Sequence, residues 1–279
     1  MPPPALDLTV PTEKDVWRRY DDDEQRLTAA VSERMLDLAG VRRGQRVLDI
    51  ATGRGEPALR AAARVGPEGV VVGTDRSDDM LAFARERASQ AGIANLTLAV
   101  ADARTLADVP GDGFDVALCR WGLMYVDEPR RALAAARRRL SPSGRFVAAV
   151  WAEPARVSYW AMPRNVLARH APVPPVDMAA PGAFHYALPE PLRADLASAG
   201  FVVDHEEEMS TPVMEAATPD GLIAWCLAFG LARLLTGQPS PVTQAWRRDM
   251  IAEAARWRDT DGMYRLGGVT RLVVARVPG

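Results

Sequence analysis

Three aspartates lie where predicted strands end, and they are the residues of this sequence best suited to hold a small polar ligand. Asp49 lies near the end of a first apolar run, Asp75 closes a second apolar strand, and Asp102 closes a third. Parallel strands of an α/β sheet present their carboxyl ends to ligands, so the three carboxylates are expected at one edge. One aspartate after a strand is common in turns, but the repetition at three successive junctions indicates a site.

The segment after Asp49 is a small-residue turn that leads into an Ala/Leu/Arg-rich stretch typical of a helix. Its sequence is Ala51-Thr52-Gly53-Arg54-Gly55. Glycine permits the tight turn and lets a ligand approach the backbone, while the start of a helix offers N–H groups to the ligand. The pattern predicts a binding site for a nucleotide-like small molecule at the first strand.

The spacing of the glycines discriminates among cofactors. A dinucleotide fingerprint needs a third glycine, and that position holds Ala58. Asp49 repels a pyrophosphate but suits a cationic group such as an α-ammonium. No G-x-x-x-x-G-K-[ST] pattern occurs, so a phosphate loop is excluded. S-adenosylmethionine (SAM), which carries an ammonium and a sulfonium but no phosphate, is therefore the predicted cofactor, with S-adenosylhomocysteine as the product.

Strands and helices alternate between residues 46 and 151, which predicts a parallel, doubly wound sheet. Asp75 follows the glycine turn by about twenty residues, the position from which an acid holds ribose hydroxyls. Ser77 is placed to cap the helix that follows. The later segments of the alternation read NLTLAVADARTL, FDVALCRWGLMYV and RRALAAARRRLSPSGRFVAAVW.

Taken in this order, the segments resemble the class I SAM-dependent methyltransferases, most closely the branch of the ubiquinone/menaquinone-biosynthesis C-methylases. The resemblance is carried by VLDIATGRGE, GTDRSDDML, ADA, FDVALCRWGLM and RRLSPSGRFVAAVW, with a weaker likeness in GFVVDHEEE and VTRLVVARVP. It covers roughly residues 16–150. It implies a Rossmann-like, seven-stranded, mostly parallel α/β sheet with helical lid insertions. Ala51 stands where many members of the family have glycine.

The resemblance also implies roles for individual residues in binding SAM. The methionine moiety would be held by Asp49 and by the backbone of Ala51, Gly53 and Gly55. The ribose would be held by Asp75, and the adenine by Arg76, Met80, Asp102 and the backbone of Ala103. Of these roles, those of Asp49 and Asp75 also follow from the residue pattern itself. Apart from the resemblance, Arg120 and Trp121 end the fourth predicted strand, beside the position of methyl transfer, where Arg120 would contact the cofactor. The alternative is that they form a helix-cap contact and a core aromatic.

The 279 residues are predicted to form a single methyltransferase domain. Residues 1–40 would form an N-terminal helical cap, residues 41–153 the cofactor-binding core, and residues 154–191 and 209–265 lid insertions. Insertions after the fifth and sixth strands are well placed to shape an apolar substrate pocket. The alternative is that their aromatic residues form the core of the lid itself. The predicted substrate contacts are Trp121, Trp160, Phe184 and Tyr186.

Methyl transfer from a sulfonium is an in-line displacement, so the protein mainly has to position the acceptor. A base is needed only where the acceptor loses a proton. His185, in the lid sequence GAFHYAL, is the predicted base, and a structural lid histidine is the alternative. Tyr20 is a second candidate, which would gate the site or polarise the acceptor. No metal is predicted because there is no C-x-x-C and no His/Cys cluster.

The sequence thus predicts a SAM-dependent methyltransferase of secondary metabolism that acts on a small apolar or aromatic molecule. Whether carbon, oxygen or nitrogen is methylated stays open. The alternative is a protein of the same fold that catalyses a rearrangement or a decarboxylation without methyl transfer. A nicotinamide-dependent oxidoreductase is disfavoured by the missing third glycine. Methylation of nucleic-acid bases is disfavoured by CRWGLM at the end of the fourth strand.

Charge and hydropathy restrict the partners. The formal net charge is −2 and no basic stripe is evident, so nucleic acid is not an expected partner. No apolar stretch approaches the length of a bilayer span, and the N-terminus lacks the apolar core of a signal peptide. A cytoplasmic protein with a small-molecule substrate is expected. A homodimer is compatible with the sequence.

Overall fold

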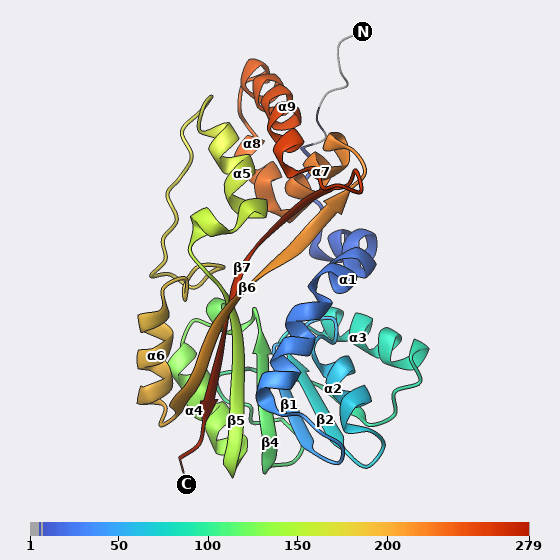
Figure 1. Ribbon diagram of the computed structural model, residues 1–279, viewed down its shortest axis with the longest axis vertical. Coiled ribbons are helices and arrows are strands. Elements are labelled where there is room, and N and C mark those ends of the chain that lie inside the picture. Colours follow the sequence, from blue (N-terminus) through green and yellow to red (C-terminus); the bar gives the residue numbers. More distant parts are fainter. Residues whose placement is uncertain (1–5, 7, 279) are drawn as a thin grey trace. The chain divides into compact units, whose positions relative to one another are not determined.

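The computed structural model describes residue 6 and residues 8–278 of the chain. Within them, one seven-stranded sheet has the strand order β3-β2-β1-β4-β5-β7-β6 (Figure 1). β1 pairs in parallel with β2 on one side and β4 on the other, and the pairs β2–β3 and β4–β5 are also parallel. β7 runs antiparallel to β5. The predicted seven-stranded, mostly parallel sheet is confirmed, and its strand order reverses between β1 and β4.

The strands in the middle of the sheet are short and apolar, and the last three in the chain are longer. Their bounds are β1 Arg46–Ile50, β2 Val70–Asp75, β3 Leu96–Val100, β4 Phe114–Arg120, β5 Leu140–Trp151, β6 Val202–Ala216 and β7 Tyr264–Arg276.

The helices begin at recognisable start signals. Thr12 accepts a hydrogen bond from the backbone N–H of Asp15 at the start of α1, and Ser77 accepts one from Met80 at the start of α3, as its sequence position predicted. The bounds are α1 Glu13–Ala39, α2 Ala58–Val65, α3 Asp78–Gln90, α4 Pro129–Arg139, α5 Ser158–Leu167, α6 Pro189–Ser198, α7 Pro219–Cys226, α8 Ala232–Leu235 and α9 Ser240–Ala254.

The described chain divides into two compact units. Unit 1 consists of the described residues up to Thr28, of Pro154–Val176 and of Ser210–Val269. Unit 2 consists of Ala29–Glu153, of Asp177–Met209 and of the described residues from Thr270 onward. The elements α1, β6 and β7 each contribute residues to both units, so the unit boundaries do not coincide with the predicted boundaries of cap and lid insertions.

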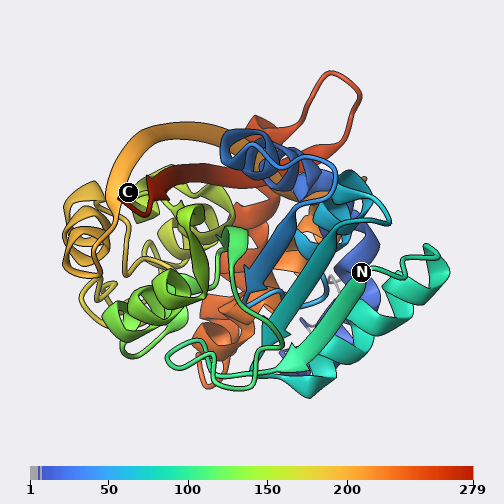
Figure 2. The same cartoon turned by 90° about the horizontal axis from the view of Figure 1, so that it is seen from below.

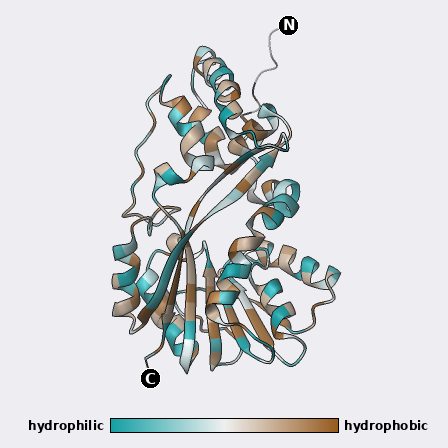
Figure 3. Cartoon of the chain, in the orientation of Figure 1, coloured by the Kyte–Doolittle hydropathy of each residue, from teal (hydrophilic) through white to brown (hydrophobic). Residues whose placement is uncertain are grey.

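The core of unit 2 lies on the two faces of its sheet. On one face, Val71, Val47 and Val116 lie side by side on three strands, and Leu118 lies beside Val147 of β5. Buried residues of α2 and of the second half of α1 pack onto them. Figure 2 shows α4 on the opposite face. The strands are correspondingly apolar along their length (Figure 3), as expected of a sheet that helices cover on both sides.

The core of unit 1 is rich in aromatic residues. Trp246 of α9 is fully buried, and its indole N–H donates to the carbonyl of Pro163 at 3.0 Å. Tyr20 packs against Trp225 with 4.1 Å between ring centroids, and Trp225 in turn stacks on Phe229. For these aromatic residues the structure supports the core alternative, since they pack against one another inside unit 1.

Candidate functional site

Asp49 fixes the turn that follows β1. Its side chain is fully buried, and Oδ2 accepts hydrogen bonds from the Thr52 hydroxyl at 2.5 Å and from the backbone N–H of Ala58 at 2.9 Å. Ala58 is the first residue of α2. One carboxylate oxygen thus ties the end of the strand to the start of the helix, which holds the glycine turn between them in one shape.

The other oxygen of Asp49 is in a different situation. Oδ1 is buried, and no described residue donates a hydrogen bond to it. Burial raises the pKa of Asp49 to about 7, although the hydrogen bonds from Thr52 and Ala58 and the attraction of Arg120 oppose the rise. A buried polar atom that lacks a partner within the protein is uncommon. It is the kind of atom to which a ligand with N–H groups can bind.

Asp75, at the end of β2, holds the same turn from the other side. Its Oδ2 accepts from the backbone N–H of Gly53 and its Oδ1 from that of Ser77, both at 2.9 Å. Each carboxylate oxygen has a second lone pair, which leaves capacity for ligand hydroxyls. Gly53 has φ +54°, and no atom lies within 4 Å of the place where a Cβ would be. The turn therefore presents bare backbone beside two carboxylates, a cradle that fits SAM.

Asp102 is already engaged by a neighbour. Both of its oxygens accept hydrogen bonds from the guanidinium of Arg104, and the backbone N–H of Arg104 adds a third contact. These contacts hold the pKa of Asp102 below its usual value. The resemblance assigns Asp102 to the adenine amino group. To bind it, the carboxylate must therefore either contact Arg104 and the ligand together or release Arg104.

The remaining residues assigned to the adenine differ in exposure. Arg76 is exposed, Ala103 is half-buried, and Met80 is 6% exposed on the inner face of α3.

Two unusual backbone positions face each other at the carboxyl ends of β1 and β4. Ala51 and Trp121 both adopt the left-handed region, with φ of +57° and +53°. Gly122, the next residue, approaches Ala51 so closely that a Cβ on it would lie 2.5 Å from the Ala51 Cβ. The glycine at position 122 is thus required by the close approach of the two turns.

Trp121 carries a second buried polar atom without a partner. Its ring stacks on that of Trp151 with 4.4 Å between centroids and 13° between planes, and the guanidinium of Arg120 lies 4.9 Å from its centroid. The indole N–H of Trp121 is buried and donates to no described residue. Arg120 also attracts the carboxylate of Asp49, which links the ends of β4 and β1 electrostatically.

His185 lies on a loop that is anchored to unit 2. Gly182 donates to the carbonyl of Met124 at 2.8 Å, and Arg271 donates to that of Ala187 at 2.9 Å. The His185 ring lies 4.6 Å from that of Tyr186, and its Nδ1 is buried without a partner among the described residues. Unit 2 therefore contains three predicted site residues with a buried polar atom that lacks a partner among the described residues, namely Asp49, Trp121 and His185.

The other predicted site residues have structural roles within their units. Phe184 and Tyr186 are 3% and 1% exposed, and the Tyr186 hydroxyl donates to Asp195 of α6 at 2.8 Å. Burial, followed by this hydrogen bond, raises the pKa of Tyr186. Tyr20 and Trp160 lie in unit 1. Burial raises the pKa of Tyr20, and the Trp160 ring lies under the guanidinium of Arg164 at 4.3 Å.

Sequence reasoning missed two residues of the site, and for a third, Trp151, it missed the ring that Trp151 contacts. Thr52 and Arg104 lie three and two residues after Asp49 and Asp102, so the local spacings D-x-x-T and D-x-R were available signals. Trp151 has no such local signal, because its contact with Trp121 is made across neighbouring strands.

Metal and membrane features were also searched for. No cluster of three or more His, Cys, Asp or Glu side chains among the described residues is arranged to hold a metal ion. Among the helices of the same described part of the chain, none has the length and apolar character needed to cross a bilayer.

The contact of Gly122 with Ala51 leads to a first prediction, on stability. Gly122→Ala should lower the free energy of unfolding by about 1–3 kcal/mol, because the new methyl group overlaps Ala51 and the φ of −103° at position 122 is one that alanine adopts without strain. Ala51→Gly in the same chain should recover most of this loss, since it removes the overlapping Cβ. Urea denaturation of the two single variants and the double variant measures the coupling. Additive effects would show that the two turns do not touch.

Comparisons with known proteins match part of the chain. A family of methyltransferase domains matches residues 42–165. The ubiquinone/menaquinone biosynthesis C-methyltransferase UbiE of Ectopseudomonas mendocina (strain ymp) is 40% identical over 120 residues, which are 43% of this chain and 46% of that protein. The chain thus spans about half the length of this curated relative.

The likeness to solved structures covers a larger share of the chain. A SAM-dependent methyltransferase from Aquifex aeolicus has a TM-score of 0.52 at 18% identity, covering 72% of this chain and 92% of that one. The [4+2]-cyclase SpnF has a TM-score of 0.55 at 19% identity, covering 96% of this chain and 97% of that one. At such identities the likeness establishes a shared fold.

Proposed function

We propose that this chain, whose residues 42–165 match a family of methyltransferase domains, is a class I SAM-dependent methyltransferase that binds SAM and transfers its methyl group to a small apolar or aromatic molecule. The observation that carries the proposal is the buried, unpartnered Oδ1 of Asp49 beside the open backbone of Gly53. An ammonium or N–H group of the ligand would supply the missing hydrogen bond and compensate the burial of the carboxylate.

The glycine turn and its two aspartates would hold the cofactor. Asp49, with the backbone of Ala51, Gly53 and Gly55, would bind the methionine moiety, and Asp75 would bind the ribose hydroxyls. Arg76, Met80, Asp102 and Ala103 would surround the adenine. When bound, SAM supplies a methyl group that its sulfonium has already activated for displacement.

In unit 2 the acceptor would lie against the stacked pair of Trp121 and Trp151, which offers an apolar surface with one unused N–H beside the guanidinium of Arg120. Acceptor contacts of Phe184, Tyr186, Trp160 and Tyr20 stay a prediction from the sequence, as do the roles of residues 1–40, 154–191 and 209–265. We favour carbon as the methylated atom because the matched relative is named a C-methyltransferase.

Isothermal titration calorimetry with SAM tests the proposal and gives the second prediction. Asp75→Ala should raise the Kd of SAM by one to two powers of ten, because two ribose hydrogen bonds are lost and the N–H of Gly53 loses its acceptor. Asp79→Ala, an equal loss of charge four residues further on, should leave the Kd within about twofold. Tight binding of NADH and none of SAM would refute the proposal.

Product analysis separates methyl transfer from the alternative chemistry of rearrangement or decarboxylation. S-adenosylhomocysteine accumulates in proportion to acceptor only where the methyl group is transferred. The shared fold of SpnF, named a [4+2]-cyclase, makes this measurement necessary. If a substrate is converted while SAM stays intact, the protein catalyses a rearrangement or decarboxylation and not methyl transfer.

A further inference from the structure

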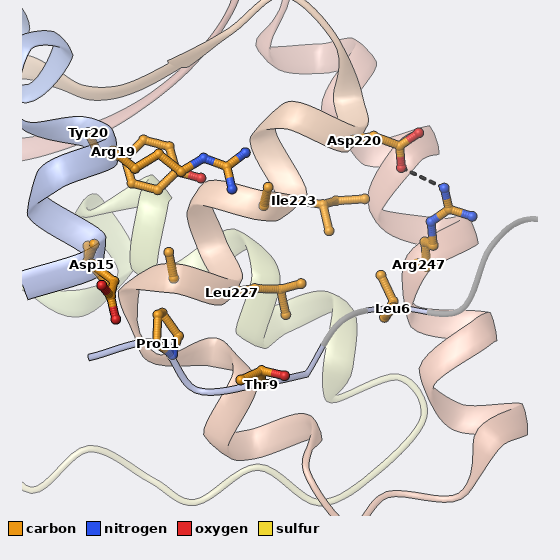
Figure 4. A pocket seen from close by; sticks show the side chains of 13 residues that line it. Leu6, Thr9, Pro11, Asp15, Arg19, Tyr20, Asp220, Ile223, Leu227 and Arg247 are labelled. Atoms are coloured by element: carbon orange, nitrogen blue, oxygen red, sulfur yellow. Dashed lines mark hydrogen bonds and ion pairs between the residues drawn. The ribbon is translucent and has the colours of Figure 1, made fainter. Parts of the chain in front are cut away.

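A cavity of about 530 Å³ lies within unit 1, separate from the proposed cofactor-binding residues of unit 2. Its lining comes from α1, from α7 and the turn that follows it, from α9, and from the segment that precedes α1 (Figure 4). Its volume is in the range of small-molecule sites, roughly 300–1,000 Å³. Its lining includes Tyr20 and belongs to the segments that the sequence predicts to form the N-terminal cap and the second lid insertion.

The walls of this cavity are mainly apolar. α7 and the turn after it contribute Ile223, Ala224, Leu227 and Ala228, and α1 contributes Val16. Leu6 and Pro11 of the preceding segment also line it. Such walls favour a ligand with an apolar body, because binding removes the apolar surfaces of both the ligand and the walls from water.

Two of the charges that line the cavity are engaged with each other, and a third is fixed locally. Arg247 of α9 forms an ion pair with Asp220 of α7 at 2.7 Å, which Figure 4 shows at one side of the cavity. Asp15 accepts a hydrogen bond from the Thr12 hydroxyl at 2.6 Å in the capping arrangement that begins α1. In Figure 4 the carboxylate of Asp15 points away from the guanidinium of Arg19.

Arg19 is the remaining charge of the lining. No carboxylate of the described residues lies within ion-pair distance of its guanidinium, whose contact is with the Tyr20 ring at 5.2 Å from the centroid. Figure 4 shows the guanidinium extending from α1 toward Ile223 of α7, over the apolar part of the lining. The lining therefore combines apolar walls with two charges that lack a counter-ion among the described residues, the exposed guanidinium of Arg19 and, turned away from it, the carboxylate of Asp15.

We propose that this cavity binds an organic anion, a molecule with an apolar body and one carboxylate or similar group that pairs with Arg19. The apolar body lies against α7 and the turn after it, and the anionic group accepts charge-assisted hydrogen bonds from the guanidinium. This site is additional to the proposed methyl transfer and does not depend on it.

Three matched probes test the charge preference in the full-length protein. 1-Naphthoate, 1-naphthamide and 1-naphthylmethylamine share one apolar body and carry a negative, zero and positive charge at neutral pH. Calorimetric titration should give a Kd for 1-naphthoate of roughly 10–100 µM and values at least fivefold weaker for the other two. Equal affinities, or tighter binding of the amine, would overturn the assignment to anions.

Two variants locate the site, each with its own control. Arg19→Gln should weaken 1-naphthoate about tenfold and 1-naphthamide little, because it removes the charge and keeps the amide-like shape. Arg18→Gln removes the same charge from a neighbouring exposed arginine outside the lining and should change neither. Ala228→Leu should weaken all three probes, because the half-buried Ala228 lines the cavity and the larger side chain fills it.

The Kd of SAM, measured on the same variants, should stay unchanged, so failure of this inference and failure of the proposed function are distinguishable. Binding of 1-naphthoate that is insensitive to both Arg19→Gln and Ala228→Leu would place the ligand elsewhere and refute the proposal. Undetectable binding of 1-naphthoate at millimolar concentration would refute it as well.

Discussion

His185→Ala should lower kcat by roughly 10²–10⁴-fold and leave the Kd of SAM nearly unchanged, if His185 takes the proton that the acceptor loses. SAM, when bound, would supply the methyl group, and the imidazole of His185 would accept the proton that the acceptor loses. The structure gives this hypothesis a physical basis, because Nδ1 of His185 is buried without a partner on a loop anchored to unit 2.

The measurement is turnover at a saturating concentration of an acceptor identified by release of S-adenosylhomocysteine, followed against pH. The wild-type rate should fall at acidic pH with a limb that the variant lacks, because an imidazolium cannot accept a proton. His205→Ala is the matched control in the same unit, since His205 is exposed and pairs with Glu207 at 2.9 Å. A variant with wild-type kcat and only a raised KM would make His185 a residue of the acceptor site without a role in proton transfer.

Asp49→Asn should change the pH dependence of stability by several kcal/mol. The pKa of Asp49 is raised from 3.8 to about 7 by burial, so the folded chain keeps a proton that the unfolded chain releases above about pH 4. The contribution of Asp49 to the free energy of unfolding of the wild type is therefore greatest below pH 4 and is lost as the pH rises from about 4 to 7. Each pH unit in this window costs about 1.4 kcal/mol, on the order of 4 kcal/mol in all.

Asparagine lacks this titration, so the stability of Asp49→Asn relative to wild type should increase steadily from pH 4 to 7. Urea denaturation across this range measures the difference in stability. The Kd of SAM should rise in the same variant, because the side chain at position 49 no longer offers the ligand a carboxylate. Asp102→Asn provides a control whose pH dependence has the opposite sign. Arg104 lowers the pKa of Asp102, so the contribution of this carboxylate to the free energy of unfolding is lost only as the pH falls below about 4. A constant difference between Asp49→Asn and wild type from pH 4 to 7 would show that the carboxylate is not buried as described.

Much of unit 2 follows from local sequence. The glycine turn after Asp49, the cap at Ser77 and the alternation of strands and helices are properties of a few consecutive residues, and the structure confirms the sheet that they predict. The orientation of Asp49 was harder to foresee. Its Oδ2 turns inward to Thr52 and Ala58, and only the other oxygen is left for a ligand.

Unit 1 could not be assembled from sequence because its parts are far apart along the chain. Tyr20 packs against Trp225, and Trp246 donates to Pro163, contacts for which no spacing rule exists. Tyr20 itself lies inside α1. The cavity around Arg19 depends on the same long-range contacts, which is why the residue pattern gave no indication of it.

The position of β7 has a consequence for how the chain is made. β7 lies between β5 and β6, although it follows both of them along the chain. Until residues 264–276 leave the ribosome, β6 has no neighbour in the sheet and β5 has a bare edge. Unpaired edges of this kind invite pairing with other chains. A nascent chain that ends before β7 therefore has neither β7 nor a paired β6 in its sheet, and its exposed edges favour aggregation until β7 is made.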